Sequence, residues 1–192
     1  MAFIKTNTES HRQTESMVIT ETKLKGAFVI DLEPFEDVRG FFARSWSERE
    51  FEAFGLEGRF VESNVSFNKK KGTLRGMHFQ SAPYEQTKLV RCTRGSIYDV
   101  IVDLRTASPT FKQWVAVELS EENHRTLYVP GEFAHGFQTL EDNTEIFYQV
   151  SSYYAADHAS GVRWNDPAFN ITWPSNDLIM IPRDRDYADF AG

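Results

Sequence analysis

The stretch Lys71-Gly72-Thr73-Leu74-Arg75-Gly76-Met77-His78-Phe79-Gln80 is followed eight residues later by Lys88-Leu89-Val90-Arg91, after a turn-like segment at Ser81-Ala82-Pro83-Tyr84. It predicts two strands, over 73–80 and 87–93. Read with a period of two, one face of the first strand carries Leu74, Gly76, His78 and Gln80, and the other carries Met77 and Phe79. Arg75 would then point away from His78. We expect a β-bulge at Gly76 that changes the direction of a side chain. A core strand has little other reason to hold both Arg75 and His78.

Short extended segments recur on both sides of this stretch, about ten residues apart and separated by residues that favour turns. Such spacing favours an all-β fold, either a sandwich or a barrel. The segments are 17–19, 27–32, 41–46, 60–66, 73–80, 87–93, 96–105, 114–119, 126–129, 136–140 and 145–150. We expect one short helix over 47–54, N-capped by Ser47 and ended by Gly55, and another in the tail after Tyr153.

The length and composition are those of one globular domain. The chain has 192 residues, of which 41% are hydrophobic, 26% are charged and 14% are aromatic, including 16 Phe. A high aromatic content favours strands over helical bundles. Residues 1–16 are polar and aperiodic, so we expect a flexible N-terminal extension there and a single folded domain over 17–192.

Charge and cysteine content argue against several classes of protein. The net charge of −7 is unsuited to binding nucleic acid, although local cations can still hold a small anionic ligand. The sequence has neither an apolar run of about 18 residues nor the pattern of a secretory signal, which argues against a membrane partner. Cys92 is the only cysteine, so no internal disulfide can form. These features indicate a cytoplasmic protein.

Several motifs, in order and at family spacing over roughly residues 17–190, resemble those of the dTDP-4-dehydrorhamnose 3,5-epimerases. Besides the opening stretch they are Asp37-Val38-Arg39-Gly40-Phe41-Phe42, Asn64-Val65-Ser66, Asp99-Val100-Ile101-Val102-Asp103-Leu104-Arg105, Ser108-Pro109-Thr110-Phe111, Pro130-Gly131-Glu132-Phe133-Ala134-His135-Gly136-Phe137, Tyr153-Tyr154 and Trp164-Asn165-Asp166-Pro167. The resemblance implies a cupin-like jelly-roll β-sandwich. It also implies a sugar-nucleotide epimerase that works without a cofactor.

The resemblance carries catalytic roles over by position. His78 matches the general base, Asp184 the carboxylate that pairs with it, Lys88 the cation beside the substrate carbonyl and Tyr148 the acid on the opposite face. Inverting a carbon next to a ketone requires removal of a proton, stabilisation of an enolate and return of a proton to the other face. An imidazole, an ammonium and a phenol suit these three tasks. Asp166 is a rival partner for His78, although a residue before proline in a turn is typically structural.

The resemblance also implies the substrate contacts. Aromatic residues line the ligand, arginines contact the diphosphate and the substrate, and a histidine hydrogen-bonds near the diphosphate. The expected residues are Phe35, Arg39, Phe42, Arg44, Glu62, Asn64, Ser66, Arg75, Gln80, His135 and Tyr154. Dimers of the family exchange N-terminal strands, so the resemblance implies a homodimer in which the partner subunit supplies some of these contacts.

Three positions depart from the family pattern. Arg44 stands where the family usually has Glu, and Glu62 stands where it usually has Gln. The two departures suggest a compensating ion pair between Arg44 and Glu62, and hence a nucleotide or sugar other than the usual dTDP-6-deoxyhexulose. The segment before Asp184 also lacks the usual Ser, which weakens the assignment of Asp184.

His135 lies in a motif that also resembles the second metal motif of metal-dependent cupins. The first metal motif needs a His-x-His pair, whereas His78 is followed at the second position by Gln80. Because few imidazoles are well placed, we predict that the protein has no metal site.

The sequence therefore favours an isomerase that epimerises a nucleotide-linked 4-keto-6-deoxy sugar at C3 and C5 through an enolate, in deoxysugar or surface polysaccharide biosynthesis. Within this class, a 3-epimerase or an enzyme for another nucleotide sugar stays open. Two other classes also stay open: a metal-dependent cupin oxygenase and a non-catalytic sugar-nucleotide binding protein.

Overall fold

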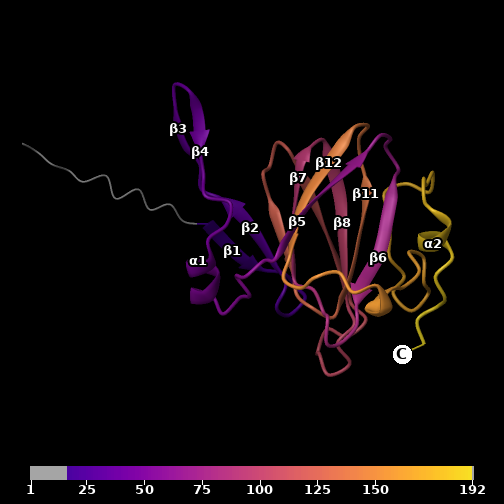
Figure 1. Cartoon of the computed structure of the whole chain (residues 1–192). Helices are drawn as coiled ribbons and strands as arrows, with labels where there is room; N and C mark the ends of the chain where they lie inside the picture. Colours follow the sequence, from indigo (N-terminus) through magenta and orange to yellow (C-terminus); the bar gives the residue numbers. More distant parts are fainter. Residues whose placement is uncertain (1–16, 192) are drawn as a thin grey trace, which may run out of the picture.

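A computed structural model describes residues 17–191, which form two antiparallel sheets that face each other (Figure 1). The first sheet has six strands in the order β1 (Met17–Glu21), β2 (Phe28–Leu32), β10 (Thr126–Val129), β7 (Lys88–Arg94), β12 (Thr144–Val150) and β5 (Glu62–Asn68). The second has five strands in the order β13 (Ala159–Gly161), β6 (Leu74–Gln80), β11 (Phe133–Thr139), β8 (Ser96–Asp103) and β9 (Trp114–Ser120). The predicted β-sandwich is confirmed, whereas the predicted extension at residues 1–16 lies outside the described residues.

The short elements lie at the two ends of the sandwich. The helix α1 (Glu48–Ala53) begins after Ser47, as predicted, and the tail contains a 3-10 helix, η1 (Ala156–His158), and the helix α2 (Pro182–Arg185). None of the helices among the described residues is long and apolar enough to span a membrane. Most expected bounds agree with the observed ones to within two residues, and two bounds differ by more. The strand expected to start at residue 136 starts at Phe133, and the extended run expected over 41–46 ends at Phe42.

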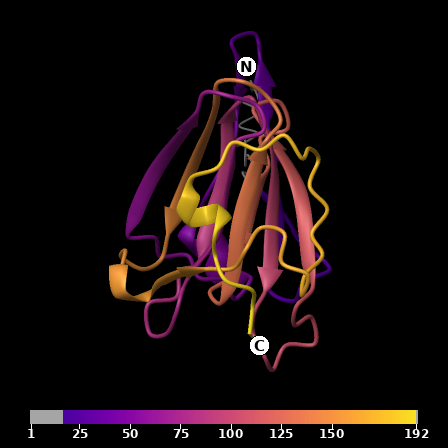
Figure 2. The same ribbon diagram turned by 90° about the vertical axis from the view of Figure 1, so that its right-hand side faces the viewer.

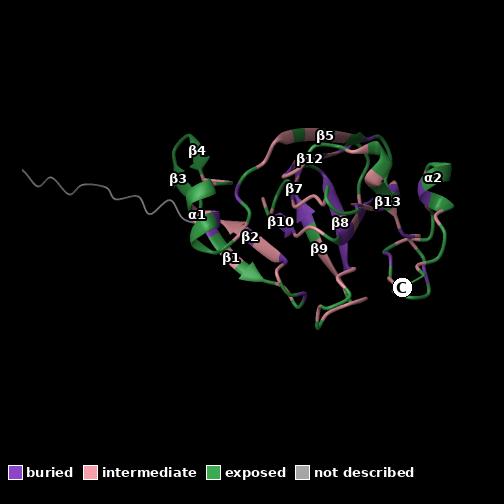
Figure 3. Ribbon diagram, turned by 60° about the horizontal axis from the view of Figure 1, so that its bottom comes forward, coloured by how far each residue is buried: buried purple, intermediate pink, exposed green. Residues whose placement is uncertain are grey.

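That run ends early because it belongs to a small hairpin of its own. The hairpin joins β3 (Phe35–Asp37) to β4 (Gly40–Phe42), and all six strand residues are exposed (Figure 3). Figures 1 and 2 show it projecting from the end of the molecule opposite to α2. Within the described chain this hairpin therefore lies far from the strand β6.

The core has two layers because both faces of β8 are covered. Ile97 and Ile101 point between the sheets, whereas Val100 and Val102 pack under the C-terminal tail. This alternation follows from the two-residue period of a strand. The side chains on the inner faces fill most of the space between the sheets. The cleft described below occupies the rest of that space.

The predicted bulge in β6 is confirmed by its pairing with β11. His78 pairs with His135 and Arg75 pairs with Phe137, so three steps on β6 match two steps on β11. The chains approach closely at the bulge, where a Cβ on Gly76 would lie 2.6 Å from the Cα of Gly136. Only glycine fits there, and Gly76 also has φ +142°.

The bulge changes which side chains share a face of β6. Leu74 and Met77 both pack in the outer cluster under the tail, while Arg75 and His78 line one cleft between the sheets. The simple alternation, which put Leu74 and His78 on the same face, was therefore wrong. The extra residue resets the alternation between Leu74 and His78.

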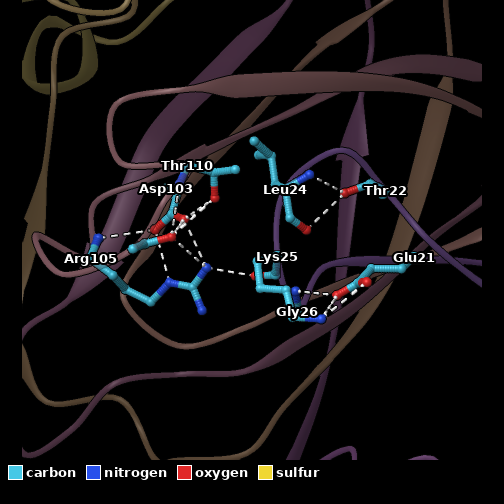
Figure 4. Close-up of polar contacts among 9 residues, drawn as sticks. Glu21, Thr22, Leu24, Lys25, Gly26, Asp103, Arg105 and Thr110 are labelled. Atoms are coloured by element: carbon cyan, nitrogen blue, oxygen red, sulfur yellow. Dashed lines mark hydrogen bonds and ion pairs between the residues drawn. The ribbon is translucent and has the colours of Figure 1, made fainter.

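A buried carboxylate ties the end of β8 to the turn between β1 and β2 (Figure 4). Asp103 is fully buried and accepts hydrogen bonds from Arg105 Nε (2.9 Å) and Thr110 Oγ1 (2.6 Å). Arg105 Nη2 in turn donates to the backbone oxygen of Lys25 at 2.6 Å. Burial alone would raise the pKa of Asp103, but the hydrogen bonds from Arg105, Ser108 and Thr110 lower that pKa to about 2.

We predict that Asp103→Asn lowers the free energy of unfolding by about 3 kcal/mol at pH 7, because it leaves the Arg105 charge without its buried partner. Since the pKa of Asp103 is lower in the folded state, its contribution is full above about pH 4. The contribution is lost as the pH falls toward about 2. Chemical denaturation of both proteins from pH 7 to pH 2 measures this. A variant as stable as the parent at pH 7 would contradict it.

Candidate active site

A cleft of about 300 Å³ opens between the two sheets. Strands of both sheets, the tail and the segment around β13 contribute to its walls. The lining residues are Ser66, Arg75, His78, Phe79, Gln80, Gln86, Lys88, His135, Phe137, Ile146, Tyr148, Tyr154, Ala159, Ser160, Arg183 and Tyr187. The cleft is therefore mixed, with apolar walls and a concentration of ionisable groups.

The imidazole of His78 is held by Asp184 at the wall formed by β6. His78 Nε2 lies 2.9 Å from Asp184 Oδ1, and Gly76 N donates to Asp184 Oδ2 at 3.2 Å. The tail reaches this position because it runs along the start of β6, where Leu74 N donates to the Ile179 oxygen at 3.0 Å. One carboxylate thus fixes both the histidine ring and the bulge beneath it.

The environment of His78 suits a base that works near neutral pH. Burial lowers the pKa of His78, and the hydrogen bond and charge of Asp184 offset part of that lowering. Arg183 Nη2 also lies 3.3 Å from His78 Nε2. We assign the Nε2 proton to the bond with Asp184, because the carboxylate is nearer and oppositely charged. Nδ1 is then the ring nitrogen left to accept a proton.

The carboxyl of Asp184 stays ionised. Burial would raise the pKa of Asp184, but hydrogen bonds from His78, Gly76 and Arg183 bring that pKa below its ordinary value. The side chain is only 2% exposed. A carboxylate at this place favours the protonated form of His78 after it has taken a proton.

Lys88 enters the cleft from the facing sheet. It is the first residue of β7, its side chain is buried, and its Nζ donates to the backbone oxygen of His78 at 3.2 Å. Burial lowers the pKa of Lys88 to about 8, and the charge of Asp99 limits the fall. The ammonium is therefore desolvated, close to the base and still largely charged at pH 7.

Tyr148 lies on β12, next to β7 in the sheet that faces His78. It packs against the core between the sheets and lines the same cleft as His78. Burial raises the pKa of Tyr148, the charge of Arg75 lowers it, and the charge of Glu62 raises it. A phenol with a raised pKa keeps its proton at neutral pH and can donate it.

Five other residues expected at the substrate site also line this cleft. They are Ser66, Arg75, Gln80, His135 and Tyr154. Gln80 is already engaged there, because its Nε2 donates to the Tyr84 oxygen at 2.7 Å and its Oε1 accepts from Ala155 N at 2.7 Å. Gln80 thus holds the surrounding loops in place.

The sequence interpretation missed several lining residues, among them Gln86, Ser160, Arg183 and Tyr187. Arg183 directly precedes Asp184, so the assignment of Asp184 to the site could also have indicated Arg183. Ser160 lies on the short edge strand β13, and Gln86 and Tyr187 lie outside the helices and strands, so tertiary contacts set the position of all three.

Three of the expected residues lie outside the cleft on the exposed hairpin. Phe35 and Phe42 are about half exposed, and Arg39 pairs with Asp37 of the same hairpin. Glu62 and Asn64 lie on β5, opposite Val150 and Tyr148 of β12. Neither of these two side chains is among those that line the cleft.

The predicted ion pair between Arg44 and Glu62 was wrong. Arg44 Nη1 instead lies 3.2 Å from Glu50 Oε1 of α1. The cause is the early end of β4 at Phe42, which leaves Arg44 beside the helix rather than in a strand next to β5.

His135 and Asp166, two other residues considered in the sequence, each have a hydrogen-bond partner of their own. His135 Nε2 lies 2.7 Å from Asp99 Oδ1, so this histidine is tied to a buried acid. Asp166 accepts from Ala168 N at 2.8 Å and so supports its own turn instead of pairing with His78. Within residues 17–191, no group of three or more His, Cys, Asp or Glu side chains is arranged to hold a metal ion.

Known proteins share this architecture. A family model described as dTDP-4-dehydrorhamnose 3,5-epimerase matches residues 21–192. A protein of that name from Sinorhizobium fredii is 46% identical over 167 residues, 87% of this chain and 83% of that protein.

The chain belongs to the dTDP-4-dehydrorhamnose 3,5-epimerase family.

Solved structures of two epimerases are similar throughout the chain. The enzyme from Bacillus anthracis with TDP and PPi bound is 47% identical with a TM-score of 0.88, over 91% of this chain and 100% of that one. A 3'-monoepimerase from Streptomyces bikiniensis in complex with dTDP-quinovose is 30% identical with a TM-score of 0.80, over 88% of this chain and 86% of that one. The fold is thus the predicted cupin-like one, and the chain is an isomerase.

We predict a bell-shaped dependence of kcat/KM on pH. Because the pKa of His78 is lowered, the acid limb lies below 6.5, and because Lys88 must be charged, the rate falls as the pH rises through about 8. Lys88→Arg should lower the rate but remove the alkaline limb, since a guanidinium stays charged. Steady-state rates from pH 5 to pH 10 measure this. A parent rate that is constant from pH 7 to pH 9.5 would contradict the role of Lys88.

Proposed function

We propose that this protein epimerises dTDP-4-keto-6-deoxyglucose or a close analogue at C3 and C5, without a cofactor, in deoxysugar biosynthesis. One observation carries the proposal: a histidine and a tyrosine line one cleft from facing sheets, and a buried lysine lies beside them. Within one chain Arg44 binds Glu50 and not Glu62, the pairing on which a different nucleotide depended. The related 3'-monoepimerase from Streptomyces bikiniensis has dTDP-quinovose bound, which supports a dTDP-linked sugar.

In the proposed reaction His78 Nδ1 removes the proton from the carbon next to the C4 ketone. The electron pair of the broken C–H bond forms the enolate, and the charge that develops on O4 is held by the ammonium of Lys88. Asp184 stabilises the imidazolium. Tyr148 then gives its proton to the other face of the carbon, which inverts the centre, and solvent restores both side chains.

The cleft also supports binding of a diphosphate. Arg75 and Arg183 both line it, and guanidinium groups suit phosphate oxygens. His135 and Ser66 add hydrogen-bonding groups to the same walls. Tyr154 is 64% exposed at the cleft and offers a ring face for stacking on a base.

The exposed hairpin supports a homodimer. Phe35 and Phe42 expose large apolar surfaces that the other residues of the described part of the chain, 17–191, leave uncovered. We propose that the hairpin of one subunit reaches the cleft of the other, where Arg39 would meet the nucleotide. The cytoplasmic location stays a prediction from the sequence.

We predict that the parent enzyme incorporates deuterium from D₂O into dTDP-4-keto-6-deoxyglucose at C3 and C5, followed by NMR. His78→Asn should abolish exchange at both carbons, because it removes the proposed base. Tyr148→Phe should keep exchange while slowing inversion by on the order of 10²-fold or more, because the proton returns only from the His78 side.

The outcomes separate the alternatives. Exchange that persists in His78→Asn, or that disappears in Tyr148→Phe, would reject the two-sided mechanism. Label at one carbon only would indicate a 3-epimerase. Activity that a chelator removes would favour a metal-dependent cupin, and binding of dTDP without exchange would favour a non-catalytic binding protein.

We predict that two inactive variants restore activity when their subunits are mixed. Arg39→Ala removes the hairpin cation, and His78→Asn removes the base. In a mixed dimer with exchanged hairpins, the intact cleft of the Arg39→Ala subunit receives the intact hairpin of the other, so one complete site forms. Unfolding and refolding the mixed variants, followed by an activity assay, measures this. If each hairpin served its own cleft, the mixture would stay as inactive as its components.

A further inference from the structure

A buried carboxylate lies behind the cleft, and the proposed reaction does not use it. Asp99 of β8 is fully buried, on the same face of the strand as Ile97 and Ile101, which pack between the sheets. A charge in such surroundings is costly unless it has partners. Its presence in the middle of an apolar row therefore needs an explanation.

Only one oxygen of this carboxylate is engaged by the described residues. Oδ1 accepts from His135 Nε2 at 2.7 Å, whereas Oδ2 is buried without a hydrogen bond. The negative charge of this carboxylate still acts on neighbouring groups, because little solvent is present to screen it. Lys88 of the facing sheet lies close to this carboxylate. Its Nζ contacts the backbone oxygen of His78, which pairs with His135 across β6 and β11, and Lys88 and His135 line the same cleft. The charge of Asp99 favours the protonated form of Lys88.

Lys88 needs such support because its own contacts are weak. Its ammonium is buried and makes one neutral contact, to the backbone oxygen of His78 at 3.2 Å. No direct ion pair to Lys88 is present within residues 17–191. Burial opposes the protonation of Lys88, and the charge of Asp99 favours it.

We propose that Asp99 is a positioning residue that keeps Lys88 charged and directed at the reacting carbonyl, while His135 holds the carboxylate in place. This role rests on the proposed epimerase function. Asp99 touches no substrate in this account. It acts through the field that it imposes on the ammonium, and the bond from His135 prevents its carboxylate from turning away.

Other ionisable groups face the same space, and each must be considered in a titration. They are Arg75 and His78 of β6, Cys92 of β7, His135 of β11, Tyr148 of β12, Arg183 and Asp184 of α2, and Tyr154 and Tyr187. Burial raises the pKa of Cys92 to about 11 and also raises the pKa of Tyr148, so both titrate above Lys88. Burial lowers the pKa of His78 from 6.5, so it titrates below Lys88.

The direct test is the titration of the Lys88 ammonium by ¹⁵N NMR of lysine-labelled protein without substrate. The signal of Lys88 is the one that disappears in Lys88→Arg. In the parent protein the Lys88 ammonium should titrate near pH 8. In Asp99→Asn it should titrate at a clearly lower pH, and the alkaline limb of the deuterium-exchange rate should shift by the same amount. At pH 7.5 the exchange rate should fall on the order of tenfold, less than the 10²–10³ expected when a stabilising group itself is removed.

Asp103→Asn is the matched control, because Asp103 is an equally buried acid on the same face of the same strand. It should reduce stability without moving the titration of Lys88. In the Lys88→Met background, Asp99→Asn should cause no further loss of exchange. Should Asp99→Asn fail to fold, Asp99→Leu, which suits the apolar neighbours, replaces it.

An unchanged titration of Lys88 in the Asp99 variant, or an equal change in Asp103→Asn, would overturn the inference. The titration needs no substrate, so it decides the role of Asp99 even if the parent enzyme shows no deuterium exchange. Absence of exchange in the parent would instead reject the proposed function.

Discussion

The carboxylate of Asp184 is the contact on which the site depends. It holds the imidazole of His78 through one oxygen and the backbone N–H of Gly76 through the other. The first bond orients the base, and the second bond fixes the bulge that turns Arg75 and His78 into the same cleft. Because the acid comes from the tail and the bulge from the middle of the chain, the site forms only when the tail has docked on β6.

Much of the fold followed from local patterns. Alternating residues in β8 and the close spacing of turn residues sufficed to predict an all-β sandwich or barrel, and the resemblance to the family selected the sandwich. Gly76 beside Arg75 and His78 sufficed to predict the bulge. The strand alternation and the bulge depend on residues that are neighbours in sequence, so the sequence alone sufficed to predict them. The ordered motifs then brought His78, Lys88 and Tyr148 together as candidates, and the structure has all three lining one cleft.

The parts that the sequence did not predict depend on long-range packing. Nothing near Arg44 indicates that β4 ends at Phe42 and leaves the guanidinium beside Glu50. Similarly, nothing in the sequence around Asp99 indicates that its partner His135 lines the same cleft as Lys88, because Lys88 comes from the facing sheet. The short strand β13 has no apolar alternation at all, and it exists because β6 offers it a free edge.

In the proposed mechanism the base and the acid act on opposite faces of one sugar ring, with an ammonium at the ketone oxygen between them. A crystal structure of the protein with an unreactive dTDP-sugar analogue would place these groups around the ring. We expect the ring in the cleft, with His78 and Tyr148 on opposite faces of C3 or C5 and Lys88 Nζ within hydrogen-bonding distance of O4. A ring with His78 and Tyr148 on the same face, or one bound outside this cleft, would contradict it.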